Sequence, residues 1–247
     1  MLKGTSPLAT SSDIENEIST NDMATDSEVT LAPLELETAT KSEPKLLDDE
    51  TLFGALPSTI WFGVYPQNDE TGVQFEPIKW RVLSQDSNEA LLLADSILDN
   101  VSYHTTNVNI SWANCGLRSW LNGEFKSLAF TDTQINSGIV NKTITTDGSE
   151  NTTDKVFILD STEANNMGGD AERVATSSSF AKGVYSVNNA LEVDASGHAA
   201  WWLRSKGATS GYKGFVDPNG MIITDGAPPD RDSYGVHPAI CVNMASI

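Results

Sequence analysis

The last fifth of the chain carries WWLRS at residues 201–205, the turn sequence DPNG at 217–220 and the closing run YGVHPAI at 234–240. Short apolar and alternating runs predict strands at 200–203, 214–216, 221–224 and 236–242. The DPNG sequence places Pro and Asn-Gly where a type I turn followed by a left-handed residue closes a hairpin. The C-terminal part is therefore predicted to consist of antiparallel strands.

Three further strands are predicted near the start of the folded region, at 60–65, 78–83 and 90–94. Residues 78–83 alternate strictly between apolar and polar, so Lys79 and Arg81 are expected to face water. The three strands lie close together in the sequence with turn residues between them. An antiparallel meander is the simplest pairing.

Helices are predicted in the middle of the chain. Apolar residues at steps of three and four form one stripe over 117–129, and Thr131 and Gln134 have the spacing of a capping box for a second short helix. A strand at 155–159 follows, and then a helical turn capped by Asp160 or Ser161. Residues 168–197 are rich in Gly, Ser and Asn, and a long irregular connection is expected there, with at most one helical piece near 180–181.

The order of strands, helices and strands predicts an α+β fold. We expect a mainly antiparallel sheet built from both ends of the chain, with flanking helices and long loops. A chain of 247 residues is long enough for one sizeable core.

The N-terminal region has a different composition. Residues 1–60 contain 12 acidic and 3 basic side chains, with Phe53 as their only aromatic residue. Such a segment buries too little apolar surface to offset the entropy lost on ordering. We therefore predict a disordered, acidic stalk rich in Ser, Thr, Glu and Pro over 1–57, and a single α+β domain over 58–247.

The charge of the chain limits its partners. A formal net charge of −19 repels phosphate backbones, so no nucleic-acid partner is expected. No apolar run approaches the roughly 20 residues that span a bilayer, and the N-terminus lacks the pattern of a secretion signal. No membrane insertion by this chain is expected. The stalk composition resembles that of bacterial wall-associated proteins, which favours an extracellular or cell-surface location without a leader in this chain.

No cofactor or metal site is predicted. His104, His198 and His237 are too far apart for a local metal motif, and the acidic loop at 225–232 is expected to be a solvated turn rather than a calcium site. Cys115 and Cys241 have no metal-ligand spacing; they either form a disulfide or remain as two buried thiols.

Seven motifs occur in an order that resembles a bacterial domain-of-unknown-function family of Gram-positive surface and secreted proteins. They are FGVYPQ at 62–67, PIKWRVL at 77–83, ALLLADSILD at 90–99, LRSWLN at 117–122, TTDKVFILDSTEANN at 152–166, WWLRS at 201–205 and YGVHPAICVN at 234–243. The family is in turn similar to the C-type-lectin-like fold of formylglycine-generating enzymes and of variable ligand-binding proteins. This resemblance implies a lectin-like scaffold. The chain departs from the family pattern at Lys206, where proline is common, and at His237, where arginine is usual; histidine there is expected to be a weaker, pH-sensitive substitute.

Five residues near the C-terminus are candidates for ligand contact because amphipathic aromatic rings and arginine favour interfaces: Trp202, Arg204, Tyr212, Arg231 and Tyr234. Each also has a structural interpretation. Trp201 and Trp202 point to opposite faces of a strand, so either both are buried or one faces a ligand. Arg204 either forms a fork to a ligand or pairs with Asp217 or Asp232.

These observations favour a non-catalytic, monomeric, extracellular ligand-binding or adhesion module on a flexible stalk, with a surface glycan or a protein as its ligand. One alternative is a structural spacer of a larger cell-wall protein. Another is an oxidoreductase of the formylglycine-generating type, which requires Cys115 and Cys241 to lie together in an open cleft.

Overall fold

The computed structural model describes residues 45–46, 56–69, 71–146, 150–185, 191 and 193–247. By its contacts the chain divides into Met1–Glu37 and Thr38–Ile247, and every described residue belongs to the second unit. The predicted stalk at 1–57 lies outside the described residues, except for strand β1 (Lys45–Leu46) and residues 56 and 57. The stalk and the domain boundary therefore stay predictions.

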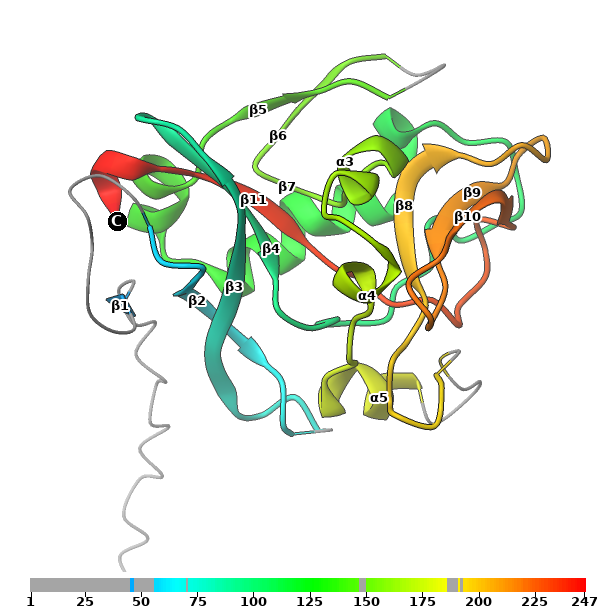
Figure 1. Cartoon of the computed structure of the whole chain (residues 1–247), viewed down its shortest axis with the longest axis horizontal. Helices are drawn as coiled ribbons and strands as arrows, with labels where there is room; N and C mark the ends of the chain where they lie inside the picture. Colours follow the sequence, from blue (N-terminus) through cyan, green and yellow to red (C-terminus); the bar gives the residue numbers. More distant parts are fainter. Residues whose placement is uncertain (1–44, 47–55, 70, 147–149, 186–190, 192) are drawn as a thin grey trace, which may run out of the picture. The chain divides into compact units, whose positions relative to one another are not determined.

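The larger sheet combines strands from both ends of the described region. Its order is β1-β2-β3-β4-β11-β7, and every neighbouring pair is antiparallel (Figure 1). The strands span β2 (Thr59–Pro66), β3 (Phe75–Gln85), β4 (Glu89–Ala94), β7 (Val156–Phe157) and β11 (Ala239–Asn243). Strands β2, β3 and β4 pair in sequence order, which confirms the predicted antiparallel meander. The C-terminal strand β11 lies between β4 and β7, which confirms that the sheet is built from both ends of the folded region.

The other C-terminal strands form a separate sheet in the order β10-β9-β8, rather than joining the larger one. They are β8 (Trp201–Lys206), β9 (Lys213–Val216) and β10 (Ile222–Ala227). The predicted turn joins β9 to β10. Gly220 has a φ of 86° and its N–H donates to the Asp217 carbonyl at 3.0 Å, so the left-handed residue is where the DPNG sequence predicts it.

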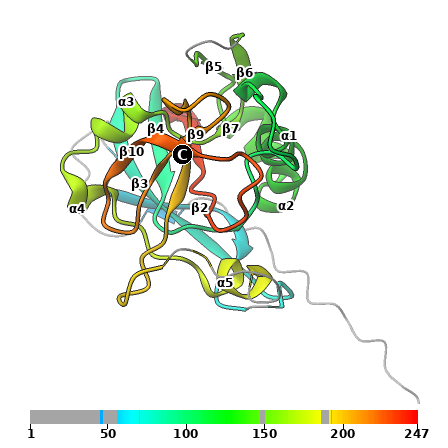
Figure 2. The same cartoon turned by 90° about the vertical axis from the view of Figure 1, so that its right-hand side faces the viewer.

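The predicted helix at 117–129 is confirmed as three consecutive segments, α1 (Gly116–Trp120), the π-helical η2 (Leu121–Phe125) and α2 (Lys126–Ala129). Most of the predicted stripe is buried, namely Leu117, Leu121, Phe125 and Ala129, and Trp120 is partly buried, whereas Leu128 is exposed. Figures 1 and 2 together show this helix on one face of the larger sheet. The predicted capping box begins the next helix, η3 (Gln134–Gly138): Gln134 N–H donates to Thr131 Oγ1, and Thr131 N–H donates to Gln134 Oε1.

The remaining elements are short. The segment 168–197 contains two helices where at most one was predicted, α4 (Asp170–Arg173) and α5 (Ser179–Tyr185). The others are α3 (Ser161–Asn165), the hairpin strands β5 (Lys142–Ile144) and β6 (Thr152–Asp154), and the 3₁₀ turns η1 (Trp112–Asn114) and η4 (Met244–Ser246). This composition confirms the α+β class with antiparallel sheets; the C-type-lectin-like detail stays a prediction.

The adjacent tryptophans of β8 pack on opposite sides of the strand. Trp201 lies 4.8 Å from the His237 ring and donates through Nε1 to the Arg173 carbonyl. Trp202 contacts the rings of Tyr103 and Tyr234. Both indole side chains are completely buried, so β8 is held between two apolar layers.

One prediction about the surface is wrong. Arg81 was expected to face water because of its alternation in β3. Its side chain is instead partly buried, and Nη1 donates 3.0 Å to the Glu172 carbonyl of α4. The cause is tertiary: α4 covers a strand face that the local pattern alone marks as exposed.

Candidate functional site

The five predicted contact residues do not form one surface. Trp202 and Tyr234 are buried against each other, and neither offers a face to a ligand in this structure. The Arg231 guanidinium is exposed and lies 5.0 Å from the centre of the Tyr234 ring. Tyr212 is half-buried in the loop before β9. The Arg204 guanidinium lies at the start of α3, apart from the other four side chains.

The sequence suggested that Arg204 pairs with Asp217 or Asp232. The structure shows two other partners for its guanidinium. Its Nη2 lies 2.8 Å from Asp160 Oδ2 and its Nη1 lies 2.5 Å from Glu163 Oε2. The expectation fails because β8 runs beside the segment that leads into α3: Arg204 N–H donates 3.0 Å to the Leu159 carbonyl.

The two carboxylates that hold Arg204 also cap α3. Asp160 accepts the Glu163 N–H at 2.8 Å, and Glu163 accepts the Asp160 N–H at 2.9 Å. This reciprocal capping box holds both carboxylates in position to pair with the Arg204 guanidinium. The result is a hydrogen-bonded cluster of two carboxylates around one guanidinium, with Arg204 only 3% exposed.

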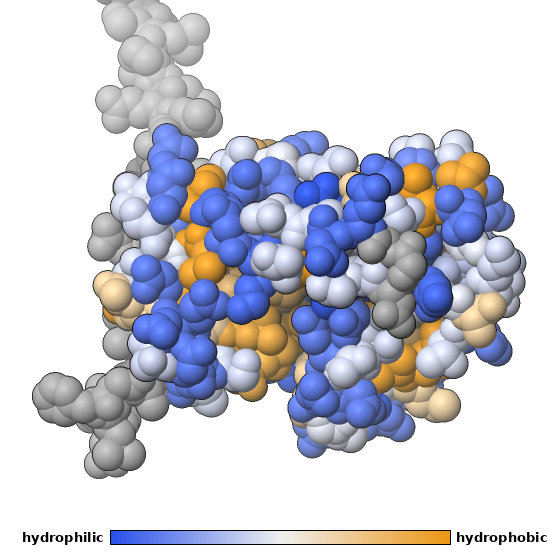
Figure 3. All heavy atoms as spheres, turned by 90° about the horizontal axis from the view of Figure 1, so that it is seen from above, coloured by the Kyte–Doolittle hydropathy of each residue, from blue (hydrophilic) through white to orange (hydrophobic). Residues whose placement is uncertain are grey.

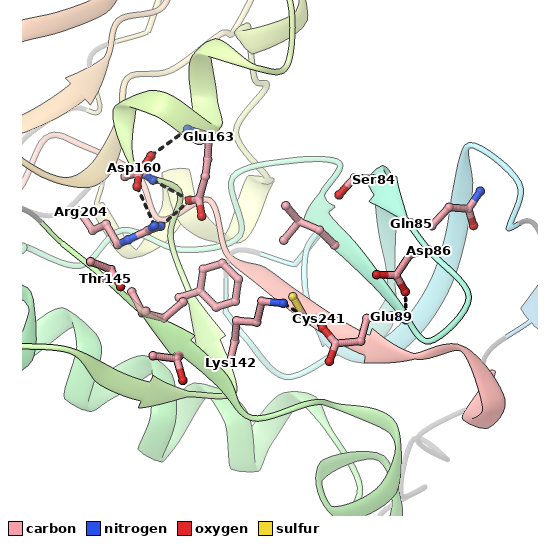
Figure 4. Close-up of a pocket in the computed structure, with 14 residues that line it drawn as sticks. Ser84, Gln85, Asp86, Glu89, Lys142, Thr145, Asp160, Glu163, Arg204 and Cys241 are labelled. Atoms are coloured by element: carbon pink, nitrogen blue, oxygen red, sulfur yellow. Dashed lines mark hydrogen bonds and ion pairs between the residues drawn. The ribbon is translucent and has the colours of Figure 1, made fainter.

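This cluster forms one end of an open pocket of about 640 Å³ (Figure 4). The opposite end is the turn between β3 and β4, with Asp86 and Glu89. One long side is β5. The lining residues are Ser84, Gln85, Asp86, Glu89, Leu91, Lys142, Thr143, Ile144, Thr145, Phe157, Asp160, Glu163, Arg204 and Cys241. We call this space the pocket.

The floor of the pocket is apolar. Leu91 pairs with Cys241 across β4 and β11, and Phe157 pairs with Ala239 across β7 and β11, so Leu91, Cys241 and Phe157 share one face of the sheet. In Figure 3, which views the molecule from the side of β5 and β6 in Figure 1, apolar residues show in the recesses between hydrophilic side chains. A ligand in the pocket would meet hydrocarbon below and polar groups at the sides.

The charged groups at the β3–β4 end are fixed by their partners. Lys142 Nζ lies 2.8 Å from Glu89 Oε2, and this hydrogen bond raises the lysine pKa. Asp86 Oδ1 accepts the N–H groups of Asn88 and Glu89, and these bonds lower the pKa of Asp86. The Asp86 carboxylate and the Lys142 ammonium are therefore charged at neutral pH.

The pocket exists because one hairpin leaves the edge of the larger sheet. Val140 N–H donates to the Cys241 carbonyl at 2.8 Å, and sixteen residues later Val156 pairs with Ile240 of the same strand β11. Strands β5 and β6 lie between these two points and pair with each other. We call β5 and β6 the arm; the arm stands over the sheet face that forms the floor (Figure 1).

The base of the arm is fastened by a buried carboxylate. Asp154 accepts hydrogen bonds from Trp112 Nε1 at 2.9 Å and from Arg118 Nε at 2.8 Å. Asn122 reinforces it from the same helix: its Oδ1 accepts the N–H groups of Lys155 and Val156, and its Nδ2 donates to the Val156 carbonyl. The LRSWLN and TTDKVF motifs therefore meet in space, and together they hold the arm in place.

Sequence reasoning missed most of the pocket. Of its lining residues, only Arg204 was a candidate for ligand contact. The predicted helix cap at Asp160 or Ser161 was the one local signal, and it indicated a helix start rather than a site. Glu89, Lys142 and Cys241 come together only through the sheet topology.

The two cysteines lie in different parts of the fold. Both cysteines are free and buried; Cys115 caps α1 and Cys241 lies in β11. Burial raises the pKa of each thiol to about 11, so both are protonated at neutral pH. Within the part of the chain that the structure describes, no group of three or more His, Cys, Asp or Glu side chains is arranged to hold a metal ion.

None of the helices in the described residues is both long enough and apolar enough to cross a membrane.

Comparison with known proteins gives one match. A family model described as "Domain of unknown function (DUF6273)" matches residues 87–244, which is more than half of the chain. The matched range includes β4, the arm and β11, whereas β2 and β3 precede it although they share the same sheet. A search of curated proteins and a search of solved structures each gave no match. On the strength of the family match, the chain belongs to the DUF6273 family.

Proposed function

We propose that this protein is a non-catalytic ligand-binding or adhesion module, and that the pocket beneath the arm is its binding site. The observation that supports this most is the pocket itself. Its volume of about 640 Å³ falls within the range of roughly 300–1,000 Å³ that is usual for ligand sites. Fixed charged groups at both ends and an apolar floor are the composition expected of a site that orients its ligand.

The proposal includes the setting of the module. We place it outside the cell or on the cell surface, carried as a monomer on a flexible N-terminal stalk, with a surface glycan or a protein as its ligand. The acidic, Ser-, Thr- and Pro-containing N-terminal composition supports this setting.

The two alternatives receive less support. A structural spacer has no need of an open, charged pocket. An oxidoreductase of the formylglycine-generating type needs two thiols that face each other, whereas Cys115 and Cys241 are both buried, unpaired and part of different elements. Neither alternative accounts for the arm.

The test is a binding screen of the full chain on arrays of glycans, proteins and peptides, run with calcium and again with a chelator. A Thr143→Trp variant is screened in parallel, because Thr143 is exposed on β5 and lines the pocket, so the indole fills the space. Thr153→Trp is the matched control: Thr153 is the exposed cross-strand partner of Thr143 in the arm and does not line the pocket.

Saturable binding by the wild type and by Thr153→Trp, with loss in Thr143→Trp, is the expected result. Binding that survives in Thr143→Trp would place the ligand elsewhere on the domain. No binding on any array, with or without calcium, would favour the structural spacer.

A further inference from the structure

We infer that the ligand of the pocket is an extended peptide segment carrying a lysine side chain, bound along the open edge of β5. This inference rests on the proposed function, since it names the ligand class of that same site. It combines the geometry of the strand edge, the charges of the pocket and the nature of its floor.

The pocket runs along the main chain of β5. Four consecutive residues, 142–145, line it. Because successive side chains of a strand point to opposite faces, we place a space lined by four consecutive residues beside the edge of the strand. Within the described residues β5 pairs with β6 on one side only.

An open strand edge presents N–H and C=O groups that match another strand. Residues 142–145, of which the first three form β5, extend over roughly 13 Å when extended, enough to pair with a peptide of about four residues. Addition of a strand to such an edge is a common way of binding an extended peptide, in which main-chain hydrogen bonds give affinity and side-chain pockets give specificity.

The charges of the pocket favour a cationic side chain. Four carboxylates, from Asp86, Glu89, Asp160 and Glu163, face two cations. Both cations are already engaged, Lys142 by Glu89 and Arg204 by Asp160 and Glu163. An anionic ligand would have to break one of these pairs.

Asp86 is the carboxylate best placed to receive an ammonium group. Its Oδ1 holds the turn between β3 and β4, and its side chain is exposed. The Lys142 charge is near enough to contribute to its lowered pKa, but among the described residues the salt bridge of Lys142 is made to Glu89 rather than to Asp86. The net charge of −19 adds a long-range attraction for cations. An approaching basic peptide is therefore steered toward this protein rather than repelled.

The floor suits the aliphatic part of lysine. Leu91 is partly exposed at the centre of the floor, between Ser84 and Cys241 in the strand register. A lysine stem can cover this apolar surface while its ammonium group reaches the carboxylates at the end of the pocket. A short acidic residue in the same position would lack the aliphatic stem that covers Leu91, and its charge would be repelled by the carboxylates.

The experiment measures fluorescence anisotropy of a labelled hexapeptide, Thr-Lys-Thr-Lys-Thr-Lys, titrated with the full chain. Four comparison ligands are used: the same peptide with Glu for Lys, two versions N-methylated on alternate amides, and free 1,5-diaminopentane as competitor. The protein variants are Asp86→Asn, which keeps the acceptor for the turn, and Asp69→Asn. Asp69 is a matched control because its carboxylate also holds a turn by accepting backbone N–H groups, outside the pocket.

The expected result is binding of the lysine peptide but not of the glutamate peptide. Asp86→Asn weakens it about two- to fivefold, the usual effect of losing one partly exposed charge pair, and Asp69→Asn leaves it unchanged. One of the two N-methylated peptides binds about tenfold or more weakly, because only one set of alternate amides faces β5.

Two outcomes overturn the inference while leaving the proposed function intact. One is that the arrays yield a ligand blocked by Thr143→Trp that is a glycan or an anionic peptide. The other is that the lysine peptide binds, but N-methylation has no effect or 1,5-diaminopentane displaces it at equal concentration. Absence of any ligand blocked by Thr143→Trp overturns both proposals.

Discussion

The buried histidine His237 should make the protein lose stability as the pH falls from neutral. The ring is completely buried, and its Nε2 donates 2.6 Å to the Ala94 carbonyl. Because a carbonyl only accepts, the neutral ring carries its hydrogen on Nε2. A second proton would sit on Nδ1, which has no hydrogen-bond partner in the structure.

Burial is the main reason why the pKa of His237 is lowered to about 3, and the positive charge of Arg81 contributes a smaller part of that decrease. The unfolded chain has an ordinary histidine pKa of about 6.5. Between these values the unfolded state binds a proton that the folded state does not, so stability rises with pH and is lost as the pH falls through this window. The expected pH-sensitive behaviour of His237 therefore concerns folding, because the folded ring itself stays neutral until the pH is far below neutral.

The size of the effect follows from linkage. The complete loss between pH 6.5 and pH 3 is about 5 kcal/mol, and about 2 kcal/mol of it falls between pH 7 and pH 5. Asp99 acts in the opposite direction, since burial raises its pKa and protonation stabilises the folded state. A comparison with a variant that lacks only the histidine separates the two contributions.

The assay is urea unfolding followed by tryptophan fluorescence at pH 7, 6 and 5, for the wild type and for His237→Gln. Glutamine can still donate to the Ala94 carbonyl but takes up no proton. The difference in unfolding free energy between the two proteins should shift by about 2 kcal/mol in favour of the variant from pH 7 to pH 5.

A second variant controls for destabilisation as such. Val242→Ala removes buried methyl groups from β11 and keeps the histidine, so it should retain the wild-type dependence on pH. A difference between wild type and His237→Gln that stays constant across the pH range would refute the argument.

Three further substitutions test other parts of the structure. Gly220→Ala should cost more than about 2 kcal/mol, because φ is 86° and the new Cβ would lie 1.9 Å from the Asp170 carbonyl oxygen, whereas Gly123→Ala, with open space around it, should be neutral or stabilising; equal melting temperatures would contradict this. Asp154→Ala should cost about 3 kcal/mol in urea unfolding, because Arg118 and Trp112 lose their shared acceptor; a loss below about 1 kcal/mol would show that the arm is held by other contacts. Lys213→Met should leave the melting temperature at pH 7 unchanged or raise it, because burial lowers the pKa of this lysine and its ammonium group contacts the face of the Tyr103 ring at 5.4 Å; a clear decrease would mean that the ammonium group is held more strongly than by this cation–π contact.

The elements were predictable wherever local chemistry decides them. The helix at 117–129 follows from its apolar stripe, and the helix after Thr131 follows from a capping box whose partners are three residues apart. The helix after Asp160 follows from the predicted capping residue. The turn at 217–220 follows from residues that fit its backbone angles. Each of these depends on neighbours within a few positions.

The site was not predictable because its residues are distant in the sequence. Arg204 is 41 residues from Glu163, and Glu89 is 53 residues from Lys142. No local pattern states which strand will lie beside which. Arg81 shows the same limit, since alternation correctly placed it on one face of β3 but gave no sign that α4 would cover that face.

The way the arm joins the sheet has a consequence for evolution. Both of its roots are bonded to the single strand β11, and its base is fastened by Asp154 and Asn122. A change in length or sequence beyond Ile144 and before Thr152 would therefore leave the strand order untouched. Lengthening a surface loop costs little free energy. Thr145, which lines the pocket, belongs to this stretch, so the wall of the pocket can change here while the sheet keeps its strand order.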